Sequence, residues 1–511
     1  MSERRVAESE GVGPRTGEAH LLASGALVQQ LAQAAGLLAL LAIVTVLARR
    51  VSVAELGAYG LVASLAGYLL VLRNSVAASA VRAMAAAPDE CERARMFSVT
   101  ALLYAVVGLA TALLIAAVAL AIGAIVRPDL ADDVRAGGAG LGVLTGVGIA
   151  ASVNLDALRA QRRFVRAAQL EIVSVAIYLV VMLALILADA DLTFVIAASG
   201  LLPLLSGMLS ALAARRMELG LRLVRGSSTR ERRMAIVPTA GWLLVVELSN
   251  LAMYGFSRII LGAHRPTGVV GVFEGPLRAH NLLYAAGGAL AVPVVPSASR
   301  YAASGESGRL SELALRGTRY TLALFVPVCV TLIVLAEPLL EVWLGAEYGG
   351  GHTALAILVS YWIVYGGLVV TPGFLVGAGR AREVALVLAA AAVVNLALAL
   401  ILTPELGLEG PALATAIPMA LAYPLLLRLG LCASGAGLGE LVRRALAPNY
   451  ALGLVLAGGL LAARELLEPD SPPAVLGLAL AAPAAYWAAF YGLVLARSER
   501  ELARGLLRRG R

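Results

Sequence analysis

Two neighbouring apolar stretches near the middle of the chain carry charged and amide side chains at helical spacing. The stretch 235–262 is interrupted, at intervals of three, four and four residues, by Glu247, Asn250, Tyr254 and Arg258. The stretch 271–298 is interrupted, at intervals of four and three residues, by Glu274, Arg278 and Asn281. Residues spaced in this way share one face of a helix. Because an ionisable side chain costs about 3 kcal/mol or more in a bilayer core, these two faces are predicted to line a transport pathway.

The composition is that of a polytopic membrane protein. Hydrophobic residues make up 60% of the 511 residues, charged residues only 14%, and the mean hydropathy is +0.85. No class of soluble globular protein has this balance. The three cysteines and four histidines are scattered, and the chain shows no metal-ligand spacing, no nucleophile with a base and no phosphate-binding glycine loop. We therefore predict an all-α membrane protein that is not an enzyme, without catalytic residues, metal or cofactor.

The helices that must position these residues follow from windows of about 20 apolar residues. Such windows predict fourteen spans, at 26–47, 56–80, 99–126, 139–157, 169–188, 192–214, 235–262, 271–298, 319–340, 353–377, 381–403, 411–431, 449–467 and 473–496. Of the 41 arginines, 32 then fall in the two tails and the even-numbered loops, six in the odd-numbered loops, and three, Arg73, Arg258 and Arg278, within spans. By the positive-inside rule, we expect a multi-pass protein of the cell membrane with both termini cytoplasmic.

The two halves of the chain show weak internal similarity. At an offset of 214 residues, Leu47 corresponds to Leu261, Gly57 to Gly271 and Tyr59 to Phe273. Transporters built from structural repeats show similarity of this kind. The sequence therefore predicts two pseudo-symmetric six-helix lobes, 1–225 and 226–431, followed by two additional spans and a basic cytoplasmic tail in 432–511.

The densest basic loop, 215–233, contains seven arginines between the sixth and seventh predicted spans. Two interpretations stay open for it. Such a loop can dock an anionic lipid or a cytoplasmic partner, or it can act only as a topology signal and a linker between the lobes.

Six sequence motifs, in order along residues 20–430, resemble the polysaccharide and oligosaccharide-lipid flippases of the multidrug/oligosaccharidyl-lipid/polysaccharide transporter superfamily. They are LARRVSVAELGAYGLV, LRAQRRF, YGFSRIILGAHRPTGVVGVFE, VVPSASRYAASGESGRL, LLEVWLGAEY and NLALALILTPELGLEGPALATAI. The resemblance implies that a polyprenyl diphosphate-linked saccharide moves from the cytoplasmic to the outer leaflet, by alternating access of two lobes around a central cavity. It also implies a role in cell-surface polysaccharide biosynthesis.

Such a substrate needs fixed cations for its diphosphate and polar groups for its sugar. Arg258 and Arg278 are the candidate cations, because a guanidinium matches phosphate oxygens bidentately. Arg73 lies nearer the cytoplasmic side, where it is a candidate to meet the head group on entry. The candidates for hydrogen bonds to sugar hydroxyls are Tyr254, Asn250, Asn281, Gln29 and Gln33.

Each of these charges also has a purely structural interpretation. Arg258 and Glu274 lie at similar depth and can pair, and Glu274 and Arg278 are four residues apart on one helix. Arg73 can be a boundary residue that extends its charge to the interface. Glu247 lies near the middle of its span, so it is a candidate to couple transport to H⁺ or Na⁺; a protonated glutamate with a hydrogen-bond partner is the other interpretation.

Two functional alternatives share the predicted architecture. One is an ion-coupled exporter of drugs or other small molecules, which would need acidic residues without the fixed cations. The other is a peptidoglycan-precursor flippase, which would also need a cationic cavity. The expected partners are the lipid-linked saccharide, membrane lipids, a coupling ion and polysaccharide-assembly proteins; no nucleic-acid partner is expected.

Overall fold

The computed structural model describes residues 14–85, 87–161, 163–217, 221–234, 236–237, 244, 248–249, 256–291, 294–467, 471–495 and 499–501. Every regular element in these residues is helical, which confirms the predicted all-α class. Three predicted site residues, Glu247, Asn250 and Tyr254, lie outside the described residues, as does the side chain of Gln29.

Eleven helices in the described residues are long and apolar enough to cross a membrane, so the protein is a multi-pass membrane protein. The number rises to twelve if α7 (Leu192–Ala198) and α8 (Leu201–Arg216), which are bent by 42°, form one span. The predicted number of fourteen is not confirmed. Most of the predicted span 235–262 lies outside the described residues. The predicted span 271–298 overlaps α12 (Thr267–Ala291). This helix is long enough to cross a membrane, but it is more polar than the eleven apolar helices and is not one of them.

The chain forms two compact units. The N-terminal unit comprises residues 1–51 and 58–248, and the C-terminal unit comprises residues 52–57 and 249–511. The predicted division into 1–225, 226–431 and 432–511 stays a prediction.

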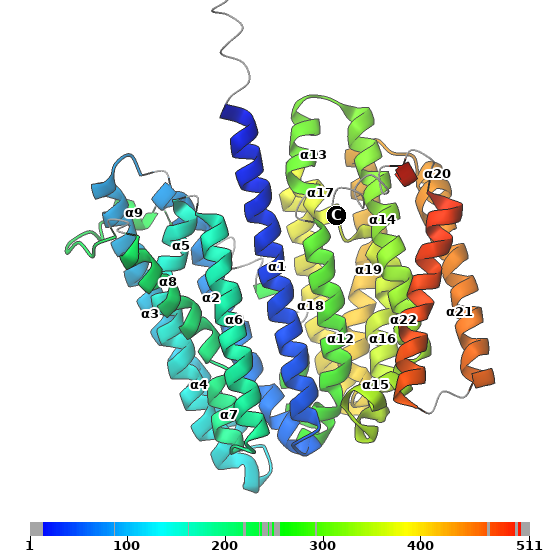
Figure 1. The fold of residues 1–511 in the computed structure, drawn as a ribbon, viewed down its shortest axis with the longest axis horizontal. Coiled ribbons are helices and arrows are strands. Elements are labelled where there is room, and N and C mark those ends of the chain that lie inside the picture. The colour runs from blue at the N-terminus through cyan, green and yellow to red at the C-terminus, as the bar shows by residue number, and fades with distance from the viewer. Residues whose placement is uncertain are drawn as a thin grey trace, which may run out of the picture. The chain divides into compact units, whose positions relative to one another are not determined.

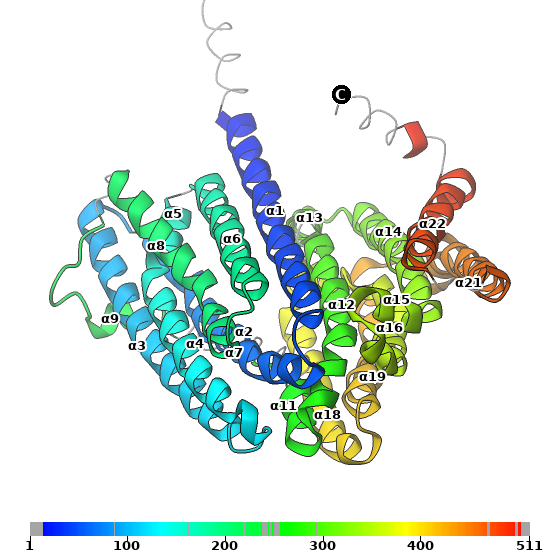
Figure 2. The same cartoon turned by 60° about the horizontal axis from the view of Figure 1, so that its bottom comes forward.

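In the N-terminal unit, α4 is the central helix. It packs against α3 on one side and against α7 and α8 on the other, while α1 packs along α6 (Figures 1 and 2). The helices of this unit, besides α7 and α8, are α1 (Pro14–Ala48), α2 (Val53–Ala85, whose first residues belong to the C-terminal unit), α3 (Glu90–Ile122), α4 (Ala131–Ala151), α5 (Val153–Ala160), α6 (Phe164–Leu187) and α9 (Arg230–Met234), with a 3₁₀ turn at Pro128–Leu130.

Glycines let α3 and α4 approach closely. A Cβ atom on Gly146 would lie 2.5 Å from the carbonyl oxygen of Gly108, and one on Gly142 would lie 2.7 Å from that of Ala112. Small residues four positions apart allow this kind of backbone contact between membrane helices. The glycine-rich sequence of α4 therefore fixes its position at the centre of the unit.

In the C-terminal unit, α16 packs against α12, α14 and α19, and α18 packs along α19. Trp362 on α16 is almost fully buried and stacks on Phe325 of α14, with ring centroids 5.2 Å apart. The helices of this unit, besides α12, are α11 (Ser257–His264), α13 (Val294–Ala303), α14 (Ser307–Val334), α15 (Ala336–Leu344), α16 (His352–Tyr365), α17 (Thr371–Gly377), α18 (Ala381–Leu406), α19 (Glu409–Ser434), α20 (Leu438–Leu441), α21 (Ala447–Leu467) and α22 (Pro472–Ala489), with 3₁₀ turns at Ala346–Gly351 and Gly366–Leu368 and π-helical turns at Val442–Leu446 and Phe490–Val494.

A symmetric contact in this unit involves residues that the 214-residue offset relates. A Cβ atom on Gly57 would lie 1.9 Å from the carbonyl oxygen of Thr267, and one on Gly271 would lie 2.0 Å from that of Val53. Gly57 and Gly271 correspond at this offset, and so do Val53 and Thr267. The start of α2 and the start of α12 thus make equivalent contacts with each other, which agrees with the predicted internal repeat.

Candidate functional site

A three-residue charge cluster lies where α11 meets α12. The Nε atom of Arg258 is 2.6 Å from Oε1 of Glu274, and its Nη2 donates to Oε2 at 3.0 Å. The Nη2 atom of Arg278, one turn further along α12, is 3.2 Å from the same Oε2. Arg258 therefore holds the carboxylate with two nitrogens, whereas Arg278 approaches it with one. The structure contains both ion pairs that the sequence offered as the structural interpretation.

The cluster is buried and contains two guanidiniums side by side. Arg258, Glu274 and Arg278 are 4%, 1% and 9% exposed. Both guanidiniums contact the one carboxylate of Glu274. Guanidinium groups bind the oxygens of anions through parallel N–H donors. These are the donor groups that an anionic ligand such as a phosphate would need.

A histidine that the sequence analysis did not single out lies next to the predicted Asn281. The Nδ1 atom of His280 is 3.3 Å from Oδ1 of Asn281, and its Nε2 is 2.7 Å from the hydroxyl oxygen of Tyr361 on α16. His280 is buried, and Asn281 is partly buried. The contact with α16 joins residues far apart in the sequence, so no local pattern could have indicated it.

The N-terminal unit contains a cavity of about 280 Å³ between α1, α2, α4, α6 and α8. Its wall includes Gln33 and Arg73, two predicted site residues that are 40 positions apart in the sequence. The other polar side chains of the wall are Asn74, Ser152, Glu171, Ser174 and Ser206. The cavity thus combines amides, hydroxyls and two opposite charges.

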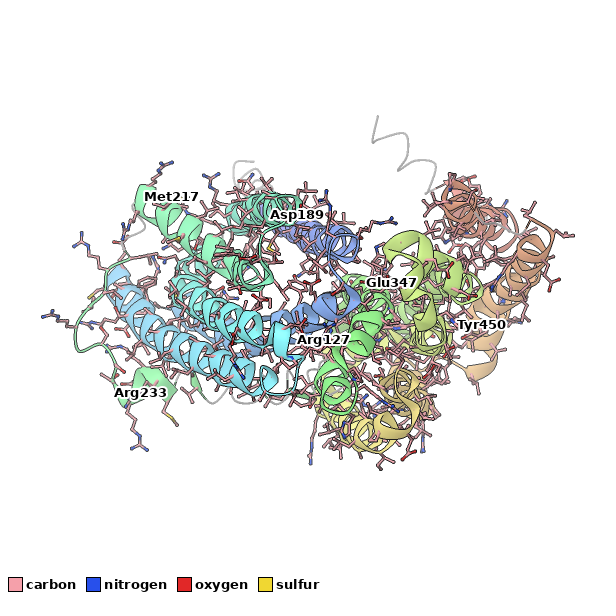
Figure 3. The ribbon with its side chains drawn as sticks, turned by 90° about the horizontal axis from the view of Figure 1, so that it is seen from below. Arg127, Asp189, Met217, Arg233, Glu347 and Tyr450 are labelled. Atoms are coloured by element: carbon pink, nitrogen blue, oxygen red, sulfur yellow. The ribbon has the colours of Figure 1, made fainter. Side chains whose placement is uncertain are left out.

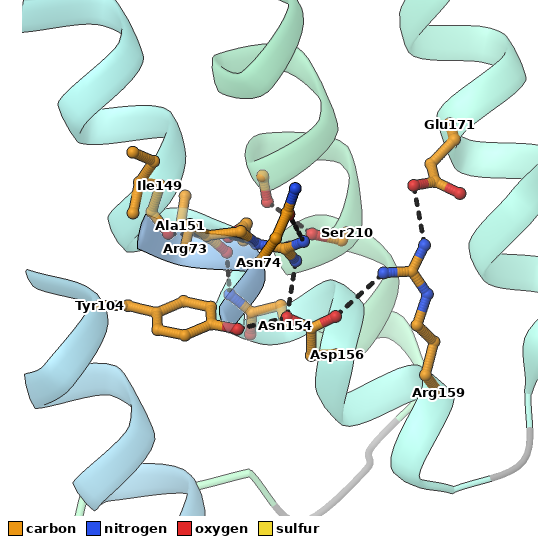
Figure 4. A network of polar contacts seen from close by, with 12 residues as sticks. Arg73, Asn74, Tyr104, Ile149, Ala151, Asn154, Asp156, Arg159, Glu171 and Ser210 are labelled. Atoms are coloured by element: carbon orange, nitrogen blue, oxygen red, sulfur yellow. Dashed lines mark hydrogen bonds and ion pairs between the residues drawn. The ribbon is translucent and has the colours of Figure 1, made fainter. Parts of the chain in front are cut away.

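Behind this wall, Arg73 takes part in a network centred on the fully buried Asp156 (Figure 4). Oδ2 of Asp156 accepts hydrogen bonds from Nη2 of Arg73 and from the hydroxyl of Tyr104, each at 2.6 Å. Oδ1 accepts from Nη1 of Arg159 at 3.0 Å, and Nη2 of Arg159 donates to Glu171 at 2.8 Å. Two arginines and two carboxylates alternate, so the network is neutral as a whole.

The structure places Arg73 at the cavity wall with its side chain only 13% exposed. Its Nε atom also donates to Ser152 at 3.2 Å, and its guanidinium carbon lies 5.6 Å from the centre of the Tyr104 ring. Sequence reasoning missed the partner carboxylate, because Asp156 falls at the end of a predicted span beside a basic loop. The spacing of Asp156 and Arg159, three residues apart on one helix, was the local signal that could have indicated it.

The model of the polysaccharide biosynthesis protein family matches residues 46–350, which is more than half of the chain. The chain belongs to this family. The matched segment includes Arg73, the Asp156 network and the Arg258–Glu274–Arg278 cluster. No curated protein sequence matches the chain.

Solved structures show that this family member has the fold of transporters of the MOP superfamily. The inward closed lipid II flippase MurJ is 14% identical, with a TM-score of 0.68 over 91% of this chain and 99% of that chain. An inward-facing multidrug resistance MATE family transporter is 15% identical, with a TM-score of 0.64 over 78% and 94%. A mutant of the Vibrio cholerae MATE transporter VcmN is 13% identical, with a TM-score of 0.56 over 82% and 98%. The family match confirms the predicted polysaccharide family, and the solved structures show the fold that the resemblance implied.

Proposed function

We propose that this protein is a flippase. It moves a polyprenyl diphosphate-linked saccharide from the cytoplasmic to the outer leaflet of the cell membrane by alternating access. The saccharide is then available for the synthesis of a cell-surface polysaccharide. The family and the transporter fold support this proposal. The observation that carries it is the buried pair of guanidiniums, Arg258 and Arg278, held side by side by Glu274.

The chemistry of a diphosphate explains why this cluster is suited to it. A diphosphate bridge is strongly anionic and is excluded from hydrocarbon, so the pathway must supply cations that are already in place. Guanidinium groups bind phosphate oxygens through two parallel N–H donors. In this proposal Glu274 orients both arginines, and the phosphate oxygens accept hydrogen bonds from the two guanidiniums.

The cavity of the N-terminal unit is suited to the uncharged part of such a substrate. Its amides and hydroxyls can donate and accept hydrogen bonds with sugar hydroxyls, and the Asp156 network behind it carries no net charge. We assign Gln33, together with Asn74 and the serines of the wall, to sugar binding; Asn281 has the same role in the C-terminal unit. Arg73 is assigned to meet the head group on entry, with Asp156 holding its guanidinium in place.

Several further roles follow from sequence reasoning and belong to this proposal. Gln29, Asn250 and Tyr254 are assigned to sugar binding. Glu247 is the candidate residue for coupling transport to H⁺ or Na⁺. The distribution of arginines supports cytoplasmic termini, and polysaccharide-assembly proteins are the expected protein partners.

An exporter of cationic drugs would need acidic residues in place of the two arginines of the cluster. A cationic drug would be repelled by the adjacent guanidiniums of Arg258 and Arg278, so this pair of arginines disfavours the exporter alternative. A peptidoglycan-precursor flippase would need the same cationic cluster. Because the fold is similar to that of the lipid II flippase MurJ, this function is the second candidate. The two flippase functions differ in the saccharide that they accept.

The proposal is tested by leaflet translocation in proteoliposomes that contain the purified full chain. The substrates are a fluorescent polyprenyl diphosphate oligosaccharide, a lipid II analogue and, under an ion gradient, a cationic dye. We expect the oligosaccharide lipid to move. Movement of the lipid II analogue alone would establish the second candidate, and movement of the dye alone would overturn the flippase proposal.

A further inference from the structure

A second cavity in the N-terminal unit has a different character from the first. It has a volume of about 760 Å³ and is lined by α3, the junction of α4 and α5, the end of α8 and the segment 221–223. It shares no lining residue with the polar cavity. We call it the amphipathic pocket, because it has an apolar wall and a charged rim; the wall comprises Phe97, Ala101, Ala150, Val153, Ala211, Ala214, Leu221 and Leu223.

The rim of the amphipathic pocket is positively charged. Arg215 and Arg222 line it, both side chains are exposed, and Glu90 is the one acidic residue of the lining. Within the described part of the chain, neither arginine has an ion-pair partner; Arg232, by contrast, pairs with Glu92. More exposed arginines follow, including Arg233 on α9, whose side chain extends outward from the unit (Figure 3). The pocket is therefore electrostatically suited to an anion.

Exposed apolar side chains lie beside the apolar wall. Leu223 lines the amphipathic pocket and, together with Leu102 of α3, a neighbouring hollow. Leu102 and Leu223 are both exposed, as is Leu212, which follows Ala211 on α8. An acyl chain in the pocket could therefore extend over Leu223 and Leu102 and remove their apolar surface from water.

The loop that forms one side of the pocket is anchored to α3. The hydroxyl of Ser98 donates to the carbonyl oxygen of Arg222 at 3.2 Å and accepts from the amide of Val224 at 2.9 Å. Arg232 donates to both carboxylate oxygens of Glu92, at 2.7 and 3.1 Å. These contacts hold the backbone at Arg222 next to the pocket before any ligand binds, which lowers the entropic cost of binding.

We propose that the amphipathic pocket binds one anionic phospholipid. Its phosphate lies between Arg215 and Arg222, and its acyl chain follows the apolar surface of α3. Basic residues at a membrane interface attract anionic lipids, but a topology signal requires only the charges. The formed pocket, with an apolar wall beside two exposed arginines, matches the two parts of an amphiphile, its acyl chain and its charged head group. This site is separate from the proposed substrate pathway, and its occupancy is tested without transport.

The test is a lipid titration of the purified full chain in detergent, with bound lipid counted by native mass spectrometry. The probes are phosphatidylglycerol and phosphatidylcholine with identical acyl chains. The variant is Arg215→Gln/Arg222→Gln, and the matched control is Arg50→Gln/Arg127→Gln, which removes two exposed arginines of the same unit outside the pocket. A charge-retaining variant, Arg215→Lys/Arg222→Lys, separates the loss of charge from any structural effect.

We expect one saturable phosphatidylglycerol per chain and weaker binding of phosphatidylcholine. The glutamine variant should bind phosphatidylglycerol roughly 30-fold more weakly, since each surface arginine is worth about a fivefold change in affinity. The control and the lysine variant should stay within a few-fold of the wild type. The proposal is overturned if both lipids bind equally, if the glutamine variant binds like the wild type, or if a polyprenyl diphosphate occupies the pocket in preference to phosphatidylglycerol.

Discussion

Replacing Asp156 by asparagine tests the buried network of the N-terminal unit. The wild-type carboxylate accepts from Arg73 and Tyr104 at 2.6 Å and from Arg159 at 3.0 Å, and it is fully buried. Breaking a buried ion pair by removing one partner costs about 3 to 5 kcal/mol. Because the two arginine side chains are 13% and 20% exposed, water offsets part of the loss. We therefore expect the free energy of unfolding to fall by about 3 kcal/mol, the lower end of that range.

Three companion variants test the reasoning behind this value. Tyr104→Phe removes one hydrogen bond but leaves both ion pairs, so it should cost about 1.5 kcal/mol. In a double-mutant cycle, Asp156→Asn with Arg73→Gln should cost less than the sum of the single changes. Asp129→Asn is the matched control: its ion pair with Arg127 is exposed, and its loss should change stability by less than about 0.5 kcal/mol.

The assay is reversible unfolding of the full chain in mild detergent by titration with sodium dodecyl sulfate, followed by circular dichroism at 222 nm. Equal stability of Asp156→Asn and Asp129→Asn would refute the account of the network. Strict additivity in the cycle with Arg73 would show that Arg73 and Asp156 do not interact energetically.

Three further predictions concern packing, charge and a helix end. Gly146→Ala places a Cβ atom 2.5 Å from a backbone oxygen and should destabilise by about 2 kcal/mol, whereas Gly36→Ala, with nothing within 4 Å, should be neutral; equal melting temperatures would contradict this. Glu274→Gln leaves two buried arginines without their carboxylate, so it should cost about 3 kcal/mol or more in the same unfolding assay, and wild-type stability would refute the pairing. Gly435 ends α19 at φ 70°, so Gly435→Ala should cost about 1 kcal/mol, and an unchanged or raised melting temperature would be the opposite result.

Much of the fold could be predicted from the sequence because bilayer thickness fixes the length of an apolar helix. The helical class and most of the spans followed from hydropathy, and the family followed from six motifs. The bend between α7 and α8 did not follow, because the apolar window runs through it without interruption. The count of fourteen depended on 235–262, most of which lies outside the described residues, and on 271–298, in which polar residues weaken the hydropathy signal.

The candidate site could be predicted where its contacts are local. Glu274 and Arg278 are four residues apart on one helix. Arg258 was predicted to lie at a similar depth in the membrane to Glu274, and the two residues do pair. The network of the N-terminal unit joins α2, α3, α5 and α6, so its partners depend on how these helices pack. The sequence indicated that Arg73 was unusual, but only the packed helices showed that Asp156 is its partner.

The central claim, that the Arg258–Glu274–Arg278 cluster recognises a diphosphate, is tested most directly by substrate discrimination in proteoliposomes. The measurement compares initial translocation rates of a fluorescent saccharide on polyprenyl diphosphate and on polyprenyl monophosphate. The proteins are the wild type, Arg278→Gln and the exposed control Arg309→Gln.

We expect the wild type and the control to prefer the diphosphate substrate. Arg278→Gln should lose roughly tenfold or more of that preference, the value of one charge-assisted hydrogen bond. A folded Arg278→Gln protein that keeps the full preference would contradict the claim.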